Sequence, residues 1–320
     1  MENFNDCSNC SHPVKEHPYK SNCNLCPCKQ LKVYVSEEKK EELIKLREAY
    51  YSVPSIKYLI VIRNKCGMNK EFEKEFAILT KRIYSPMKIA RLLTCTKYTQ
   101  LDFYFENMSL FKAPFTNFYN SLAHLDTLPL TSMNLHLRTQ EEIYAEFQDY
   151  WDEHIKGFDL LFDMDNQDIN IAHRDTKILR KILSDYQIPF STKFSGTKGF
   201  HIFTPYEWIA SKDDKFPDFI GKIDYLLKEI QAQYEIESLD TSITDSKRVC
   251  KMPYTLDIDK IVLPLTDEQF DNFDIKKMTA DYIFFKRNVE IANRGILLNT
   301  FGLTVEQSQK NFQKFVKDHI

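Results

Sequence analysis

The sequence predicts a mixed α/β (α+β) fold for most of the chain, preceded by a small cysteine-rich module. Patterns typical of helices and of strands are interspersed along the chain, which favours a mixed sheet with flanking helices. Hydrophobic residues make up 43% of the 320 residues, enough for a sizeable core. Five of the eight cysteines fall within the first 28 residues. We therefore expect a module at residues 1–30 and a larger domain at residues 31–320.

Helices are expected where apolar residues recur at helical spacing or a serine caps an acidic first turn. The expected helices are residues 36–52, which Pro54 ends, 139–155, 173–186, part of 213–234, and 305–320. Short apolar and aromatic runs predict strands. The expected strands are residues 57–63, one or two within 101–111, 158–162, and a strand, turn and strand at 190–205.

Charge is nearly balanced, with 43 Lys and Arg against 46 Asp and Glu, so nucleic-acid binding would need a local groove. The longest apolar runs, such as "YLIVI", are far shorter than the roughly 18 residues of a membrane span. The first residues, "MENFNDCSNC", lack the charged and apolar regions of a secretory signal. We expect no membrane association and no secretion, with a cytoplasmic location, or a nuclear one in a eukaryotic cell.

The N-terminal cysteines form two Cys-x-x-Cys pairs separated by 12 residues, a spacing suited to tetrahedral zinc. The expected Zn²⁺ ligands are Cys7, Cys10, Cys23 and Cys26. Cys28, His12 and His17 are further candidates for the fourth ligand. An iron-sulfur cluster is the minor alternative, and a disulfide-bonded tail is disfavoured in the cytosol.

The segment "GFDLLFDMDNQD" places Asp163 and Asp165 at the end of an expected strand. Residues two apart on a strand point to the same side, about 7 Å apart, and two such carboxylates repel unless a cation lies between them. Mg²⁺ and Mn²⁺ prefer such oxygen ligands, although a solvated pair is the plain alternative. A calcium loop is excluded because Asp168 and Arg174 stand where glycine and glutamate are needed.

A second segment, "SGTKGFHIF", begins at Ser195. Gly196 and Gly199 permit a tight turn whose amides could meet phosphate oxygens, and Lys198 adds a charge. His201 is expected beside the turn rather than in the core. The segment does not match the Walker A phosphate loop, and an ordinary hairpin with a surface histidine is the alternative.

A third segment, "LDTSITDSKRVCKMP", supplies Asp240, followed by Arg248, Lys251 and Pro253. Asp245 competes with Asp240 for any acidic role, and a solvated loop of mixed charge is the alternative. Each segment is a weak signal alone, but their order along the chain is informative.

Together the three segments resemble the archaeo-eukaryotic primase superfamily, most closely the catalytic small subunit of archaeal and eukaryotic DNA primases. Its first motif, a strand ending in Asp-x-Asp, matches "LLFDMD". Its second, Ser-Gly-x-Arg/Lys-Gly-x-His, matches "SGTKGFH". Its third, a metal-binding Asp followed by Arg-x-x-Arg/Lys-x-Pro, matches "LDTSITDSKRVCKMP". The likeness covers roughly residues 100–275. Asp257 replaces the family's usual histidine and Thr255 its serine, which puts the triphosphate contacts and the sugar preference in doubt.

The resemblance implies a DNA primase or primase-polymerase that makes primers on single-stranded DNA from nucleoside triphosphates by two-metal nucleotidyl transfer. It implies that two Mg²⁺ or Mn²⁺ ions are held by Asp163, Asp165 and Asp240. It implies that the triphosphate is bound by Ser195, Gly196, Lys198, His201, Arg248 and Lys251. The zinc module would grip the template or the initiating nucleotide, and a primase large subunit is a further expected partner. A repair or end-joining polymerase of the same superfamily and a catalytically inactive zinc-containing nucleic-acid-binding module are the alternatives.

Overall fold

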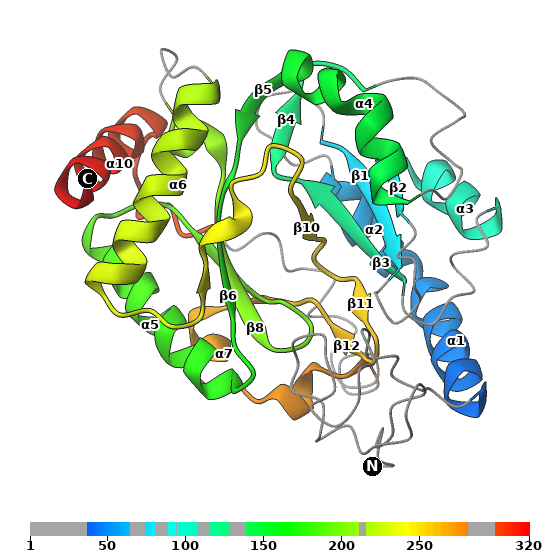
Figure 1. Cartoon of the computed structure of the whole chain (residues 1–320). Helices are drawn as coiled ribbons and strands as arrows, with labels where there is room; N and C mark the ends of the chain where they lie inside the picture. The colour runs from blue at the N-terminus through cyan, green and yellow to red at the C-terminus, as the bar shows by residue number, and fades with distance from the viewer. Residues whose placement is uncertain are drawn as a thin grey trace, which may run out of the picture.

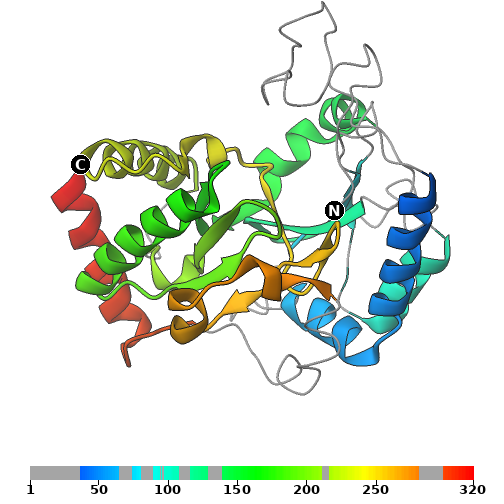
Figure 2. The same cartoon turned by 90° about the horizontal axis from the view of Figure 1, so that it is seen from below.

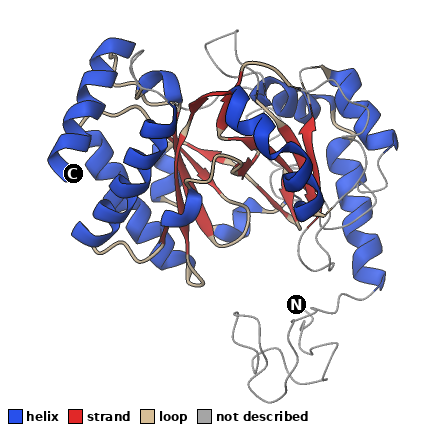
Figure 3. Cartoon of the chain, turned by 45° about the horizontal axis from the view of Figure 1, so that its top comes forward, coloured by secondary structure: helices blue, strands red, loops and turns tan. Residues whose placement is uncertain are grey.

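The computed structural model describes residues 37–64, 74–80, 89–93, 95, 97–107, 116–128, 139–210, 216–280 and 298–320. Strands occupy the middle of the molecule and helices lie on its two outer sides (Figure 3). The longer helices are α1 (Glu37–Tyr51), α2 (Pro54–Asn64), α3 (Tyr98–Asn107), α4 (Gln140–His154), α5 (Ile169–Asp185), α6 (Phe216–Gln233) and α10 (Val305–His319). The predicted mixed α/β architecture is confirmed for these residues, whereas the cysteine-rich module and its boundary lie outside them.

One antiparallel sheet carries the first two sequence motifs. Its strand order is β13 (Pro264–Leu265), β7 (Ser191–Phe194), β8 (Gly199–Thr204), β6 (Leu160–Asp165) and β9 (Leu239–Asp240). Along β6, Leu160, Phe162 and Met164 are completely buried in the core. Asp163 and Asp165 alternate with them and are only partly buried, so both carboxylates lie on the opposite face of the strand.

A second antiparallel sheet has the order β10 (Val249–Lys251), β3 (Thr116–Ser121), β1 (Phe76–Thr80) and β2 (Ile89–Leu93). Two short pairs, β4 (Ala123–Leu125) with β5 (Ile155–Phe158) and β11 (Leu256–Asp257) with β12 (Lys260–Ile261), complete the strands. In Figures 1 and 2, α5, α6 and α10 lie at one end of the molecule and α1, α2 and α3 at the other. The two sheets therefore meet between two groups of helices.

The third sequence motif crosses from one sheet to the other. Strand β9 belongs to the five-stranded sheet, while β10, only eight residues further on, pairs with β3 in the four-stranded sheet. Residues 241–248 make this crossing through a short 3₁₀ helix, Thr241–Ile243, and a turn. The start of the third motif therefore lies in one sheet and its end in the other.

A buried charge cluster lies close to the start of β6. Asp159 forms ion pairs with Lys74 and with His124 Nε2, the latter at 2.8 Å, and accepts a hydrogen bond from the Tyr206 amide. Burial opposes ionisation of Asp159, but the charges of His124 and Lys74 outweigh it and lower its pKa to about 2. The cluster joins residue 74, β4 and the start of β6 beside the core.

Most expected elements are confirmed, and the expected helix at 139–155 begins with a capping box formed by Thr139 and Glu142. Two expected strands are wrong. Residues 57–63 belong to α2, in which Pro54 opens the helix instead of only ending the one before it. Residues 101–107 belong to α3, where Leu101 and Tyr104 are buried three positions apart, a helical rather than an alternating spacing.

Within the described ranges, no helix is both long enough and apolar enough to cross a bilayer.

Candidate active site

Strand β6 places Asp163 between two residues of other motifs. In the sheet register, Asp163 stands opposite His201 on β8 and opposite Asp240 on β9. Directly opposed residues of antiparallel strands have Cβ atoms about 5 Å apart. Three segments far apart in sequence thus converge on one carboxylate, with Asp165 two residues further along the same face.

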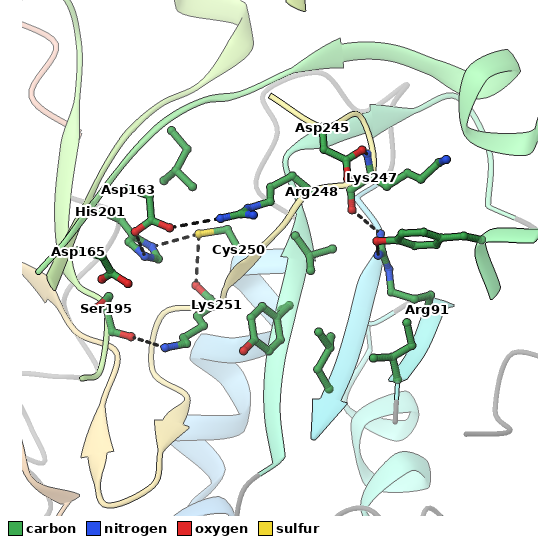
Figure 4. Close-up of a pocket in the computed structure, with 16 residues that line it drawn as sticks. Arg91, Asp163, Asp165, Ser195, His201, Asp245, Lys247, Arg248, Cys250 and Lys251 are labelled. Atoms are coloured by element: carbon green, nitrogen blue, oxygen red, sulfur yellow. Dashed lines mark hydrogen bonds and ion pairs between the residues drawn. The ribbon is translucent and has the colours of Figure 1, made fainter. Parts of the chain in front are cut away.

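Arg248 lies between two of the three carboxylates. Its Nη2 atom is 3.3 Å from Asp240 Oδ2. The same atom is 3.5 Å from Asp163 Oδ2, the contact drawn in Figure 4. Asp165 pairs instead with Lys198, at 3.1 Å. The cation that the spacing of the aspartates requires is therefore supplied here by side chains.

The described part of the chain contains no ready-made cluster of three or more His, Cys, Asp or Glu side chains placed to hold a metal ion. The Asp163 carboxylate nevertheless has spare ligand capacity. Its Oδ1 atom is buried without a hydrogen-bond partner among the described residues, and its ion-pair contact is His201 Nε2 at 3.3 Å. Burial opposes ionisation, but His201, Arg248 and Lys251 outweigh it and lower the Asp163 pKa to about 2.

Asp245, the competitor of Asp240, lines the same cavity as Asp163 but does not pair with it in the sheet register. Its Oδ1 atom accepts a hydrogen bond from the Lys247 amide at 2.9 Å, inside the turn that precedes Arg248. Asp240 instead stands next to Asp163 and caps its own 3₁₀ turn by accepting from the Ser242 amide. The geometry therefore favours Asp240 as the third carboxylate.

The turn of the second motif is tight, and its glycines are needed. Gly196 has φ of +100°, and a Cβ atom there would lie 2.6 Å from Asp257 Cβ. A Cβ atom at Gly199 would collide with the Met164 carbonyl oxygen. The Ser195 amide donates to the Gly199 carbonyl at 3.0 Å, which closes the turn.

The Lys251 side chain forms hydrogen bonds with this turn and with Asp257. Its Nζ atom donates to the Ser195 carbonyl at 3.2 Å and to Asp257 Oδ2 at 2.6 Å, while Asn117 Nδ2 donates to Asp257 Oδ1 at 3.1 Å. Burial opposes protonation of Lys251, but the Asp257 carboxylate outweighs it and raises the Lys251 pKa. Asp257, which stands where the resembled family has histidine, is thus a buried partner of Lys251.

His201 is buried rather than exposed, and it belongs to a cluster that the sequence analysis missed. Its Nδ1 atom lies 3.2 Å from Cys250 Sγ, which in turn lies 3.1 Å from Lys193 Nζ. Burial opposes protonation of His201, but Cys250 and Asp163 outweigh it and raise its pKa to about 9. Lys193 could have been found from the predicted hairpin, because it lies directly opposite His201 in the register. Nothing in the sequence indicated that Cys250 would join them.

A cavity of about 320 Å³ lies between the two sheets (Figure 4). Asp163, Asp165, Ser195 and His201 come from the five-stranded sheet, and Arg248, Cys250 and Lys251 face them from β10 and the turn before it. The cavity is also lined by residues that the sequence analysis missed: Tyr119, opposite Lys251 in the sheet register, and, further from Asp163, Arg91, Tyr144 and Lys247. Asp240, Gly196 and Lys198 adjoin the cavity through their neighbours without lining it.

Two cations, Arg91 and Lys247, lie at the missed end of the cavity. Arg91 is buried, forms an ion pair with Glu75, and donates to the Lys247 carbonyl at 2.8 Å. Lys247 Nζ lies 5.2 Å from the centre of the Tyr144 ring, a cation–π distance. This end therefore offers positive charge beside an aromatic face.

The predicted zinc ligands Cys7, Cys10, Cys23 and Cys26, like the alternatives Cys28, His12 and His17, lie outside the described residues.

No family model matches the sequence, and no curated protein matches it. Among solved structures, the fold is similar to the polymerase domain of ligase D from Mycobacterium tuberculosis, in a complex with DNA. The TM-score is 0.47 and the sequence identity 10%, over 76% of this chain and 86% of that chain. This likeness leaves the function to be inferred from the residues of the chain itself.

Proposed function

We propose that this chain is a nucleotidyltransferase of the primase-polymerase type, a DNA primase that makes primers on single-stranded DNA. The observation that carries the proposal is the register of β6, in which Asp163 lies opposite both His201 and Asp240. All three segments that resemble primase motifs meet at this point. The cavity beside them has carboxylates on one wall and cations on the facing wall, as a triphosphate with divalent ions requires.

The residues fit divalent ions by their chemistry. Asp163, Asp165 and Asp240 offer only oxygen donors, and the buried Asp163 Oδ1 lacks a hydrogen-bond partner within the described ranges. These three carboxylates would hold two Mg²⁺ or Mn²⁺ ions. When bound, such ions activate the attacking 3′ oxygen and stabilise the leaving pyrophosphate.

The remaining side chains would bind and orient the triphosphate. Arg248 neutralises Asp163 and Asp240 when no metal ion or nucleotide is bound. Once divalent ions are held by these carboxylates, its guanidinium would be released to pair with the phosphates. The Ser195 hydroxyl, buried and unpartnered among the residues described, is available to donate to a phosphate oxygen. His201, which lines the same cavity, would supply a second donor. Lys198 would supply a charge at the turn, where its side chain is 46% exposed.

Gly196 and Lys251 would act through the turn. Gly196 allows the turn to form, and Lys251 fixes it through the Ser195 carbonyl. The cavity volume of about 320 Å³ is at the lower end of the roughly 300–1,000 Å³ of small-molecule sites. A triphosphate with part of its nucleoside therefore fits the described walls.

The proposal includes the N-terminal cysteines as a zinc module that holds template DNA or the first nucleotide. Template contacts through Lys and Arg make binding weaker at higher salt. A separate large subunit would be a partner of the same assembly. Zinc content of the purified chain, compared with a Cys7→Ala, Cys23→Ala variant, tests the module independently of activity.

The central test is synthesis on a single-stranded template without any primer. The chain is given labelled ribonucleotides or deoxynucleotides with Mg²⁺ or Mn²⁺. We expect short products from the wild type and none from Asp165→Asn. Asp185→Asn, an exposed carboxylate on α5 paired with Lys181, is the matched control and should remain active.

The pattern of products separates the alternatives. Products that appear only when a 3′ end is supplied would indicate a repair or end-joining polymerase. DNA binding that is equal in wild type and Asp163→Asn, with no incorporation by either, would indicate an inactive binding module and overturn the proposal.

A further inference from the structure

Cys250 is the one described cysteine that lines the cavity. Cys95 and Cys250 are the free cysteines of the described residues, and both are buried. Cys250 differs because its sulfur lies 3.2 Å from His201 Nδ1 and 3.1 Å from Lys193 Nζ. Lys193 and His201 are directly opposed on β7 and β8, so the hairpin holds both nitrogens towards one sulfur atom on the other sheet.

The two nitrogens favour the thiolate form of Cys250. Burial alone would raise its pKa, but the charges of Lys193 and His201 outweigh burial and lower the pKa to about 6. Roughly nine-tenths of such a thiol is ionised at pH 7. Cys95 shows the opposite case, since burial without a cation raises its pKa to about 12. The thiolate is the nucleophilic form of cysteine.

The cavity beside Cys250 has room and unmet hydrogen-bonding capacity for a small polar molecule. The Ser195 hydroxyl is only 2% exposed and has no partner in the described part of the chain, yet Ser195 lines the same cavity. A volume of about 320 Å³ is several times the roughly 30 Å³ that a water molecule occupies. A hydroperoxide can therefore enter and be held next to the sulfur atom.

We propose that Cys250 is an oxidation site at which a hydroperoxide converts the thiolate to a sulfenic acid. The sulfur attacks the nearer peroxide oxygen, the S–O bond forms and the O–O bond breaks. Sulfur loses two electrons, the peroxide is reduced, and the released hydroxide or alkoxide takes a proton from water. The new oxygen atom lies in the cavity that Cys250 shares with His201 and Ser195, next to His201 Nδ1 and Lys193 Nζ.

The consequence for the site rests on the proposed function, whereas the oxidation itself does not. The added oxygen takes up the donors of His201 and Lys193 and fills space in the cavity that Ser195 also lines. Oxidation should therefore close the cavity to a triphosphate, and reduction by a small thiol should reopen it.

The first experiment measures the thiol alone. Reduced full-length chain is treated with hydrogen peroxide, sulfenic acid is trapped with dimedone, and each cysteine peptide is quantified by mass spectrometry. We expect Cys250 to be trapped in the folded protein and Cys95 to be trapped only after unfolding. The peroxide rate at Cys250 should reach half of its plateau near pH 6.

Two variants sharpen the test. Lys193→Met should lower the Cys250 rate at pH 7 at least fivefold, and Lys181→Met, an exposed lysine on α5, should not change it. Because Lys193→Met could impair folding, the wild-type pH profile decides independently. A folded wild type whose Cys250 stays unmodified, or whose rate is still rising between pH 8 and pH 9.5, overturns the proposal.

The second experiment connects oxidation to nucleotide binding. Peroxide should weaken triphosphate binding by the wild type, dithiothreitol should restore it, and Cys250→Ala should keep its own untreated affinity after peroxide. Trapping at Cys250 in a chain that never binds or incorporates nucleotides would support the oxidation site and contradict the proposed function. Binding by the wild type that persists after complete oxidation of Cys250 would overturn the predicted closure.

Discussion

Arg248→Gln removes the cation that lies between Asp163 and Asp240, and we expect it to tighten binding of Mn²⁺. In the wild type, a divalent ion must displace the guanidinium from both carboxylates. Glutamine has no charge to be displaced, so the same carboxylates attract the ion without this competition. Nucleotide binding should change in the opposite direction, because the variant lacks a phosphate-binding cation.

The magnitude follows from the two contacts of Arg248 Nη2, at 3.3 Å to Asp240 and 3.5 Å to Asp163. Coulomb's law gives each contact about 1 kcal/mol in bulk water and roughly 5 kcal/mol at an effective dielectric constant of 20. The side chains of Arg248 and Asp240 are 33% and 36% exposed, so solvent screening favours the lower figure. We therefore expect a gain of about 1–2 kcal/mol, roughly 5- to 30-fold in the dissociation constant.

The assay is titration of Mn²⁺ with detection of the free ion by electron paramagnetic resonance, at low salt and without nucleotide. Lys228→Gln is the control, since it removes an exposed cation paired with Asp224 on α6. The control should bind Mn²⁺ like the wild type. Unchanged or weaker Mn²⁺ binding by a folded Arg248→Gln chain would refute the competition between Arg248 and the ion.

Three predictions concern stability. Asp159 has a folded-state pKa of about 2, so its contribution to the free energy of unfolding is complete above about pH 4 and is lost as the pH falls to 2. Asp163, whose pKa is also about 2, loses its contribution over the same range, so urea unfolding should show a smaller acid loss in Asp159→Asn than in wild type, and the substitution costs about 3–5 kcal/mol at pH 7. Gly196→Ala should lower the melting temperature, whereas Gly221→Ala, in open space on α6, should stabilise by about 1 kcal/mol; equal shifts would contradict the backbone argument. Thr304→Ala removes the capping box of α10 and should cost about 1 kcal/mol in urea unfolding, with no loss contradicting the cap.

The sequence predicts the parts of the site that depend on local pattern. Alternation along β6 places Asp163 and Asp165 on one face, and the Gly196 and Gly199 spacing indicates the turn, both of which hold in the structure. Asp240 and Asp245 could not be separated from the sequence, because the difference lies in the pairing of β9 with β6.

The errors and omissions have a common physical origin in tertiary contacts. The apolar run within α2 is too short for its period to decide between helix and strand, and packing of Ile56, Leu59 and Ile60 on one side settles it as a helix. Cys250 and Lys193 meet only because β10 joins a different sheet from β7. The spacing of residues along the chain cannot predict a contact between side chains of two different sheets.

Residues 241–248 connect these two sheets covalently, and Asp245, Lys247 and Arg248 of this segment line the cavity. Asp163 and His201 belong to the five-stranded sheet, whereas Cys250 and Lys251 belong to the four-stranded sheet. A ligand that moves the two sheets apart should therefore lengthen the distance between Cys250 Sγ and His201 Nδ1. It should change the orientation of Arg248 at the same time. We therefore expect the Cys250 sulfur and the Arg248 guanidinium to change position together when the cavity is filled. A fluorophore or nitroxide attached to either wall should respond to this change.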